Sequence, residues 1–358
     1  MKITVITVCF NSVDTIEKAI KSVINQDYLD KEYIIVDGGS TDGTLDIIRK
    51  YEDYITKWIS ESDNGIFDAM NKGIGMASGD VIAFLNSDDW YMDSALSMVH
   101  DAFRENDCDC VCCDNYVIQK DGSQVYYDAS KLSVDDMYKR MIYFHSAIFA
   151  RKELFRQSDN FDLKYRIAAD YDWMLRAMNK GARLLYLHKP VFTFCYGGIS
   201  SVNEVECAKE AREIALQHLP VDKKRYLKEI DDRYFEIAAC RSNKEWVSSS
   251  IKMTLNMDIT IILWGAGYRG KQCLTWLQKA DIQVFGIVDS NRAKWGDKLE
   301  EVMVQPPQIL EGKTCNLIIT PDRCKEEIYE QINSFKGEIY IYELKDLWRK
   351  MVEFKKPK

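Results

Sequence analysis

The chain has 358 residues, of which 46% are hydrophobic and 29% are charged, a composition typical of soluble globular proteins and long enough for two domains. Its 48 basic and 56 acidic side chains leave a formal net charge of −8, which argues against a broad nucleic-acid-binding surface, because such a surface needs excess positive charge. The start of the chain resembles no secretory signal and no apolar run reaches membrane-spanning length, so we expect a cytoplasmic protein.

Apolar runs alternate with helical patterns over the first part of the chain. The predicted strands span 3–9, 33–36, 55–60 and 81–86, and the predicted helices span 12–25, about 41–51, 66–77 and 93–105. Strands that alternate with helices predict an α/β fold with a parallel sheet and right-handed crossovers. Ligands bind such sheets at the carboxyl ends of the strands.

Polar side chains follow each of the four predicted strands. Asn11 comes just after the first strand, Asp37 closes the second, Asp63 follows the third, and Asp88 and Asp89 follow the fourth. Each residue alone is most simply a solvated turn or a helix cap. Because the carboxyl ends of parallel strands share one edge, the set together predicts a binding site on that edge.

The second half of the chain starts with a different pattern. Residues 203–250 are helical and highly charged, and strands are then predicted at 259–264, 284–288, 316–320 and 338–342. We therefore predict four parts: a catalytic domain at 1–203, a helical linker at 204–256, a small Rossmann-like domain at 257–345, and a basic tail at 346–358.

A glycine-rich turn follows the first strand of the second domain. Gly265, Gly267 and Gly270 have the spacing of a dinucleotide-binding turn, and Asp289 ends the next strand. The glycines would let a helix N-terminus approach a pyrophosphate, and Asp289 would accept a hydrogen bond from a ribose. No Tyr-x-x-x-Lys pattern follows, so a structural or regulatory module is the alternative to an NAD or nucleotide site.

Four segments of the first domain together carry a family resemblance. TVCFNS at 7–12, YIIVDGGSTDGT at 33–44, ESDNGIFDAMNKGIGMASGDVIAFLNSDDW at 61–90 and AADYDWMLR at 168–176 resemble the family-2 glycosyltransferases of the GT-A fold. The resemblance covers residues 1 to about 200. It implies a nucleotide-diphospho-sugar transferase fold and transfer of a sugar to an acceptor hydroxyl with inversion, in surface polysaccharide or glycan biosynthesis.

The resemblance also implies roles for the rim residues. Asp89 would bind a Mg²⁺ or Mn²⁺ ion, which prefers hard oxygen ligands, and Asp88 would contact the ribose or assist the metal. Asp37 would hydrogen-bond the base or ribose, and the segment from Thr7 to Asn11 would line the base pocket. The metal would stabilise the charge of the leaving diphosphate.

Two residues of the next segment have open alternatives. Asp63 and Lys72 would reach the base or phosphate of the donor. Lys72 also lies four residues after Asp68, the spacing of a helical ion pair that contributes only a few tenths of a kcal/mol.

The acceptor side of the site is predicted from the family's Glu-Asp pattern, in which the Glu position is Ala169 here. The resemblance implies Asp170 as the general base; the alternative is that Asp170 caps the following helix. His145 and Asp172 are candidates for the acceptor side, with packing as the alternative for both.

The implied partners are a nucleoside-diphosphate sugar and a glycan or lipid-linked acceptor. The basic side chains near the C-terminus would suit peripheral contact with the inner face of a membrane: Lys345, Arg349, Lys350, Lys355, Lys356 and Lys358. The alternative functions are a nucleotide- or NAD-binding sensor run by the second domain and a non-catalytic scaffold. The sequence does not set the donor sugar, the base, the acceptor, the linkage or the oligomeric state.

Overall fold

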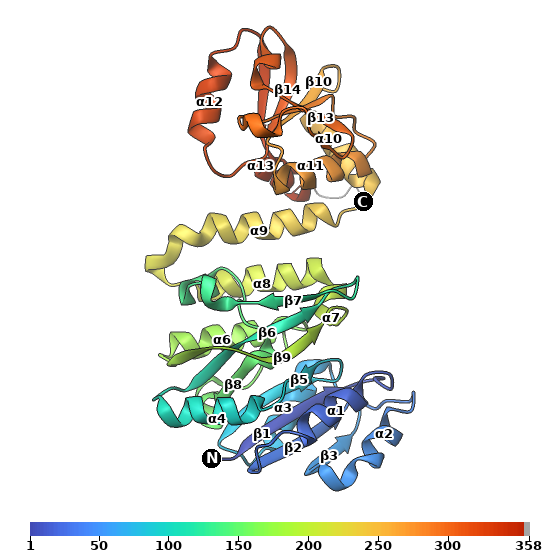
Figure 1. Cartoon of the computed structure of the whole chain (residues 1–358), viewed down its shortest axis with the longest axis vertical. Coiled ribbons are helices and arrows are strands. Elements are labelled where there is room, and N and C mark those ends of the chain that lie inside the picture. The colour runs from blue at the N-terminus through green and yellow to red at the C-terminus, as the bar shows by residue number, and fades with distance from the viewer. Residues whose placement is uncertain (354–358) are drawn as a thin grey trace. The chain divides into compact units, whose positions relative to one another are not determined.

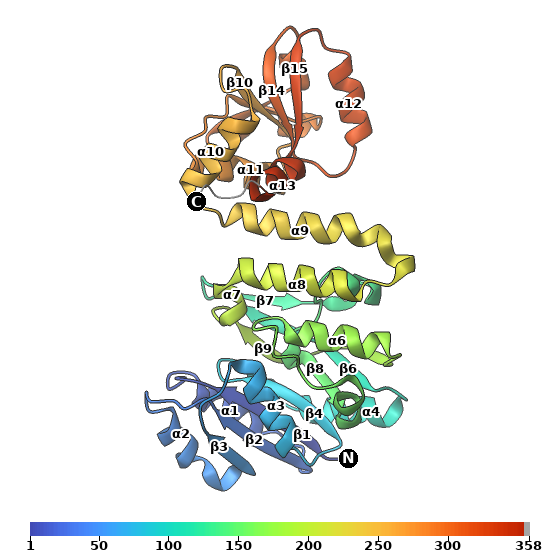
Figure 2. The same ribbon diagram turned by 180° about the vertical axis from the view of Figure 1, so that it is seen from behind.

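The computed structural model describes residues 1–353, which form two compact units with the division between Ile230 and Asp231 (Figures 1 and 2). The predicted helical linker is divided between these units. Its first helix lies in the N-terminal unit, its last helix lies in the C-terminal unit, and the middle helix, α9 (Leu227–Cys240), spans the division.

The N-terminal unit is a mixed α/β fold. Its other elements are β1 (Ile3–Cys9), α1 (Ile16–Ile24), β2 (Lys31–Asp37), α2 (Thr44–Lys50), β3 (Lys57–Ser60), α3 (Ile66–Met76), β4 (Val81–Asn86), β5 (Trp90–Tyr91), α4 (Ala95–Glu105), β6 (Cys110–Ile118), β7 (Gln124–Tyr127), β8 (Ile148–Arg151), α5 (Lys152–Ser158), α6 (Ala169–Asn179), β9 (Leu184–Cys195), α7 (Ile199–Val202) and α8 (Glu204–His218). The strands β1 and β4 have the predicted bounds. The first helix begins later than predicted, because the carbonyl of Ser12 accepts hydrogen bonds in a turn from the amides of Thr15 and Ile16.

The sheet of this unit has the order β3-β2-β1-β4-β8-β6-β9-β5, with β7 paired to β6. The first four predicted strands are parallel, as expected from their alternation with helices. Beyond β4 the sheet becomes mixed, because β8 runs antiparallel to both β4 and β6. The sheet becomes mixed after β4, the point in the chain beyond which single strands no longer alternate with single helices.

Both faces of the parallel strands are buried. Along β1, Val5 faces the core that contains α1 and α4, whereas Ile6 and Val8 face the core that contains α3 and α6. Figures 1 and 2 show these helix pairs on opposite faces of the sheet. A strand covered on both faces needs a continuous apolar run, which explains why β1, β2 and β4 lack polar alternation.

The opposite edge of the parallel strands is held by one buried glutamate. Glu32 is 3% exposed; it accepts hydrogen bonds from the Thr4 hydroxyl (2.7 Å) and the Ser78 amide (2.7 Å), and it pairs with Lys57 (3.2 Å). Burial alone would raise the pKa of Glu32, but these partners outweigh it and lower the pKa from 4.5 to about 2. The ionised carboxylate therefore ties β1 and β3 to the turn before β4.

We expect Glu32→Gln to destabilise the protein by about 3 kcal/mol at neutral pH. This is the free energy that corresponds to a pKa lowered from 4.5 to about 2. Because the folded-state pKa lies below the unfolded one, this stabilisation is complete above pH 4.5 and is lost as the pH falls towards 2. Urea unfolding of the wild type and variant at pH 7 and pH 3 measures the difference. Asp46→Asn, which breaks an exposed ion pair with Arg49, is the control. If the wild type and Glu32→Gln differed in free energy of unfolding by the same amount at pH 7 and pH 3, the stabilising role of the ionised Glu32 would be contradicted.

The C-terminal unit is a second, smaller α/β fold. Its elements are α10 (Lys244–Thr254), β10 (Thr260–Trp264), α11 (Tyr268–Lys279), β11 (Gly286–Val288), β12 (Lys298–Leu299), β13 (Val302–Gln305), β14 (Thr314–Ile319), α12 (Lys325–Asn333), β15 (Glu338–Glu343) and α13 (Leu344–Glu353). The sheet order is β12-β13-β11-β10-β14-β15, and all neighbours except β12 and β13 are parallel. This is the Rossmann-like arrangement that the alternating pattern predicts.

The segment predicted as a basic tail begins as a packed helix. Leu347 and Trp348 of α13 are buried in the core of the unit, and Lys345 and Arg349 both pair with Asp232. The predicted tail residues Lys355, Lys356 and Lys358 lie outside the described residues. Within residues 1–353 no helix is long and apolar enough to cross a membrane, and peripheral contact of the tail with a membrane stays a prediction.

Candidate functional site

The register of the parallel strands brings their carboxyl ends level. Cys9 of β1 lies opposite Asp37 of β2, and Asp37 lies opposite Ser60 of β3. On the other side of β1, Val8 lies opposite Asn86, the last residue of β4. The polar residues that follow these strands therefore lie along one rim, as the sequence predicts.

Asp37 is the most highly bonded carboxylate of the rim. It is fully buried and accepts hydrogen bonds from the amides of Gly39 (3.0 Å) and Ser40 (2.9 Å) and from the hydroxyls of Ser40 (2.5 Å) and Ser60 (2.7 Å). The Cys9 thiol is a further donor at 3.5 Å. Burial opposes ionisation of Asp37, but these donors outweigh it and hold its pKa below the usual value. Both oxygens of Asp37 thus have protein donors, and its hydrogen bond to a base or ribose stays a prediction.

The Asp63 side chain lies over the backbone of Gly38, in the loop after β2, and beside the exposed ring of Phe10. A Cβ placed on Gly38 would lie 2.6 Å from Asp63 Oδ2 and 3.4 Å from the ring of Phe10. A side chain at position 38 would therefore displace the Asp63 carboxylate. Phe10 is 62% exposed and lies within the segment from Thr7 to Asn11 that is expected to line the base pocket.

The three other residues predicted to bind the nucleotide-sugar donor differ in whether they lie at the rim. Asn11 links two rim loops, since its side-chain oxygen accepts a hydrogen bond from the Thr41 amide (3.0 Å). Thr7 lies inside β1, fully buried, and accepts a hydrogen bond from the Tyr33 hydroxyl, so it does not reach the rim. Lys72 pairs with Glu61 (2.9 Å) and lies 3.6 Å from Asp68, which is the helical ion pair weighed for it above.

Asp88 and Asp89 differ in their surroundings. Asp89 is 1% exposed and accepts hydrogen bonds from the Cys195 amide (3.0 Å) and the Ser146 hydroxyl (3.3 Å). Asp88 is half-buried, and a Cβ placed on Gly198 would lie 3.5 Å from its Oδ2. The turn after β9 that contains Gly198 therefore borders Asp88, while Asp89 is held by β9 itself.

The acidic pair lacks a compensating cation within residues 1–353, where no lysine or arginine forms an ion pair with either carboxylate. Burial raises the pKa of Asp88, and burial together with the charge of Asp88 raises the pKa of Asp89 well above its usual value. Two adjacent buried carboxylates become easier to ionise when a cation binds between them. Their oxygen donors suit Mg²⁺ or Mn²⁺, so the residues fit the metal implied by the resemblance.

His145 lies between the end of β4 and α6, with a hydrogen bond to the first and a longer contact to the second. His145 Nε2 lies 3.0 Å from the side-chain oxygen of Asn86, and His145 Nδ1 lies 3.7 Å from Asp170 Oδ2. Burial lowers the pKa of His145 to about 4, so the ring is neutral at physiological pH. The structure thus brings His145 and Asp170 to the same rim as Asp88.

Asp170 and Asp172 lie two residues apart on α6 but face different surroundings. Burial raises the pKa of Asp170 from 3.8 to about 6, a value suited to a general base near neutral pH. Asp170 is not the helix N-cap, a position occupied by Ala168. Asp172 forms buried bonds to Arg176 (2.8 Å) and His218 (2.8 Å), which favours the packing role considered for it.

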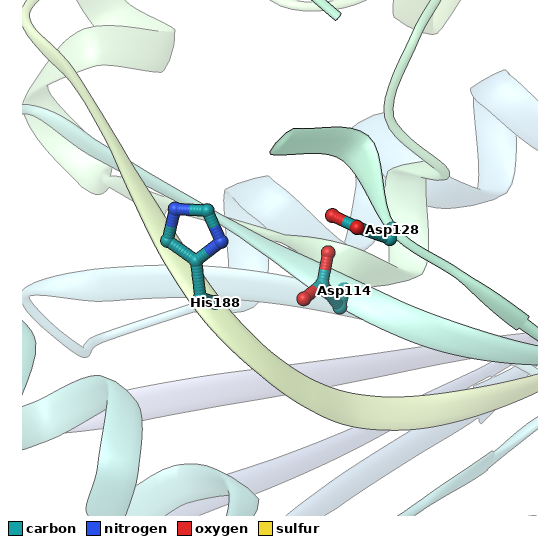
Figure 3. Close-up of side chains that lie close together, drawn as sticks. All are labelled: Asp114, Asp128 and His188. Carbon is teal, nitrogen blue, oxygen red and sulfur yellow. The ribbon is translucent and has the colours of Figure 1, made fainter. Parts of the chain in front are cut away.

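A second acidic group lies elsewhere in the N-terminal unit. Asp114, Asp128 and His188 offer ligand atoms within 4.8 Å of one another, and Figure 3 shows their side chains on neighbouring segments. Asp114 is already bonded by the hydroxyls of Tyr126 (2.5 Å) and Tyr186. A metal ion there would have to compete with these donors.

The glycine-rich turn of the C-terminal unit is built as the fingerprint requires. A Cβ on Gly270 would overlap the carbonyl oxygen of Gly265, so the first turn of α11 packs closely on the end of β10. Asp289, however, accepts hydrogen bonds from the amides of Ala266 (2.7 Å) and Asn291 (2.8 Å) and pairs with Lys294 (2.9 Å). The carboxylate expected to bind a ribose thus has protein partners, and NAD binding gains no support.

Comparisons with known proteins agree with this division of the chain. The family described as "Glycosyl transferase family 2" matches residues 4–181, and the family "C2185-like, N-terminal" matches residues 257–340. The PGL/p-HBAD biosynthesis glycosyltransferase of Mycobacterium bovis is 29% identical over 206 residues, covering 55% of this chain and 78% of that protein. The cholesterol galactosyltransferase of Borreliella burgdorferi is 29% identical over 158 residues, covering 42% of this chain and 44% of that protein.

Solved structures share the fold. TarS 1-349 of S. aureus matches with a TM-score of 0.53 at 18% identity, over 78% of this chain and 80% of that chain, whereas the match spans only 46% of a longer TarS chain. The mannosyltransferase PcManGT from Pyrobaculum calidifontis, solved with GDP-Man and Mn²⁺, matches with a TM-score of 0.54 at 15% identity, over 71% of this chain and 76% of that chain. Residues 4–181, which contain the acidic pair and Asp170, belong to glycosyl transferase family 2.

Proposed function

We propose that the N-terminal unit is an inverting, divalent-metal-dependent glycosyltransferase that uses a nucleoside-diphosphate sugar. One observation carries this proposal: a buried acidic pair without a cationic partner in the described chain lies on the same rim as a carboxylate with a pKa of about 6. A cation site and a base near one another are the two chemical elements that sugar transfer from a diphosphate needs.

The nucleotide end of the donor would bind at Phe10 and Asp63. The exposed ring of Phe10 offers a flat apolar surface for stacking by a base, and Asp63 beside it offers an acceptor for base or ribose donors. Asp37 would also support both groups: it binds Ser40, whose hydroxyl accepts a hydrogen bond from the Asn11 amide next to Phe10, and it binds Ser60 at the end of the strand before Asp63.

Phe10→Ala should weaken binding of the nucleoside diphosphate by about tenfold, because base–aromatic stacking contributes about 1–3 kcal/mol. Isothermal titration with UDP and GDP in the presence of Mn²⁺ measures the change. Phe10→Tyr retains the ring and should bind as the wild type does. Equal affinity of Phe10→Ala and wild type would rule out stacking at this position.

The metal would be held by Asp88 and Asp89. Asp89 remains a candidate ligand, but Asp88 is the more accessible carboxylate, since the oxygens of Asp89 already accept from Cys195 and Ser146. The bound ion supplies positive charge that stabilises the leaving diphosphate. These carboxylates would orient that ion at the end of β4, beside the turn that contains Gly198.

Asp88→Asn and Asp89→Asn should each raise the Mn²⁺ concentration needed for half-maximal turnover by about tenfold or more, because each substitution removes a charged ligand or its neighbour. Nucleotide release from the donor, titrated with Mn²⁺ after EDTA treatment, gives this value. His188→Ala alters the second acidic group and serves as the control. If His188→Ala raises the requirement and the Asp88 and Asp89 variants do not, the metal belongs to the second group.

The acceptor would be activated by Asp170. Its ionised carboxylate takes the proton of the acceptor hydroxyl as that oxygen attacks the anomeric carbon. The bond from the anomeric carbon to the diphosphate breaks in the same displacement, so the new bond forms on the opposite face and the configuration inverts. Neutral His145 beside Asp170 would orient the carboxylate, and the proton taken from the acceptor would remain on Asp170.

We expect Asp170→Asn to lower kcat by about 10²- to 10⁴-fold, the usual contribution of a general base, with donor affinity unchanged. In the wild type, kcat should rise with pH through about 6, because Asp170 must be ionised to act. A pH series of initial rates with an active donor and acceptor tests both points. Wild-type kcat in Asp170→Asn would exclude Asp170 as the base.

The substrate class is proposed from the relatives. TarS was solved with UDP-GlcNAc and PcManGT with GDP-Man, and a curated relative is named a cholesterol galactosyltransferase. We therefore propose a UDP- or GDP-hexose as donor and the hydroxyl of a glycan or lipid-linked acceptor, in glycan biosynthesis.

A further inference from the structure

A buried glutamate of α8 holds the loop that precedes the helix of Asp170. Glu210 is 8% exposed. Its Oε1 accepts a hydrogen bond from the Arg166 amide (2.9 Å), and its Oε2 accepts from the amides of Ile167 (2.9 Å) and Ala168 (2.9 Å). This helix lies beyond residues 4–181, the part that matches the family.

These amides need an external acceptor. The N-cap of α6 is Ala168, whose side chain cannot accept a hydrogen bond, and the carboxylate of Asp170 accepts from the Tyr171 amide instead. Unbonded amides at a buried helix start are costly. Glu210 supplies this acceptor from another helix for the three amides that precede α6, and it fixes the backbone two residues before Asp170.

Two further contacts keep α8 in place against α6. His218 Nε2 lies 2.8 Å from Asp172 Oδ1, and the His218 carbonyl accepts a hydrogen bond from the Asn179 side chain (3.2 Å). Gln217 accepts from the hydroxyl of Tyr165 (3.1 Å). Because α8 is anchored at several points, Glu210 cannot follow the loop if the loop shifts.

Glu210 also brings negative charge towards Asp170. The titratable groups that face Asp170 from neighbouring elements are His145 and Glu210. Burial is the main cause of the raised pKa of Asp170, and the charge of Glu210 raises it further. Both carboxylates lie at the start of α6, so the negative charge of Glu210 opposes ionisation of Asp170.

We propose that Glu210 is a positioning residue for Asp170, which holds the 166–168 loop in place and sets its own negative charge near the base. The inference rests on the proposed role of Asp170 as the base. It assigns a role in the reaction to α8, a helix outside the family-matched segment.

The test uses the full-length chain with Mn²⁺ and whichever of UDP-GlcNAc, UDP-galactose and GDP-mannose the wild type turns over. Glu210→Gln removes the charge and keeps one oxygen acceptor, Glu210→Ala removes both, and Glu210→Asp keeps the charge. Glu206→Gln is the matched control, because Glu206 lies on the same helix and pairs only with Lys209 among the ion pairs of the described chain. For each variant, kcat, KM for the donor and the pH dependence of kcat are measured.

We expect Glu210→Gln to move the acidic limb of the kcat profile to lower pH, and Glu210→Asp to leave that limb near its wild-type position. Glu210→Ala should lower kcat by about tenfold or more through misplacement of the base, with KM for the donor unchanged. A loss of folding alone would change the amount of active protein but would not move the acidic limb.

An acidic limb that stays at the wild-type pH in Glu210→Gln, or that moves equally in Glu206→Gln, would overturn the proposal. If Asp170→Asn is inactive while all Glu210 variants behave as wild type, only the positioning role fails. If Asp170→Asn retains wild-type kcat, the base assignment fails and the positioning role fails with it.

Discussion

The bonds of the Asp37 carboxylate organise the rim on which the rest of the site depends. Asp37 lies at the end of β2 and accepts donors from its own loop and from Ser60 at the end of β3, while Cys9 at the end of β1 donates its thiol. A buried carboxylate without such donors would be strongly destabilising. Because the donors are present, the charge instead fixes three strand ends relative to one another, and the loops that contain Phe10 and Asp63 become a defined surface.

The acidic pair at the end of β4 has the opposite electrostatic situation to Asp37. Asp88 and Asp89 are partly or fully buried, and their raised pKa values show that the protein does not supply the charge that would stabilise their ionised forms. Asp37 and Glu32 have enough donors to ionise readily, whereas the acidic pair does not. The same fold therefore contains carboxylates that hold structure and carboxylates that we propose to bind a cation.

A helix outside the family-matched segment supports the start of α6. Helix α6 begins without a capping side chain of its own, and the glutamate of α8 accepts hydrogen bonds from the amides of the residues that precede it. The buried contacts of Asp172 with Arg176 and His218 strengthen the same pair of helices. A domain boundary near residue 203 would separate α8 from the helix it supports, whereas the structural division lies between Ile230 and Asp231.

Local sequence determined the parallel strands β1 to β4 and the helices between them, because their apolar periodicity depends only on neighbouring residues, whereas the strands from β5 to β9 are not among those predicted. It also determined that polar residues would meet at one rim, since the ends of parallel strands share an edge. Only the tertiary structure decided which protein partners those residues have. Asp37 accepts hydrogen bonds from donors of three segments, Lys72 pairs with Glu61 and lies near Asp68, and the Thr7 side chain lies in the core. Hydrogen-bond partners distant in sequence leave no periodic pattern, so the remaining acceptors at Asp63 and Asp88 emerged only when the loops were placed together.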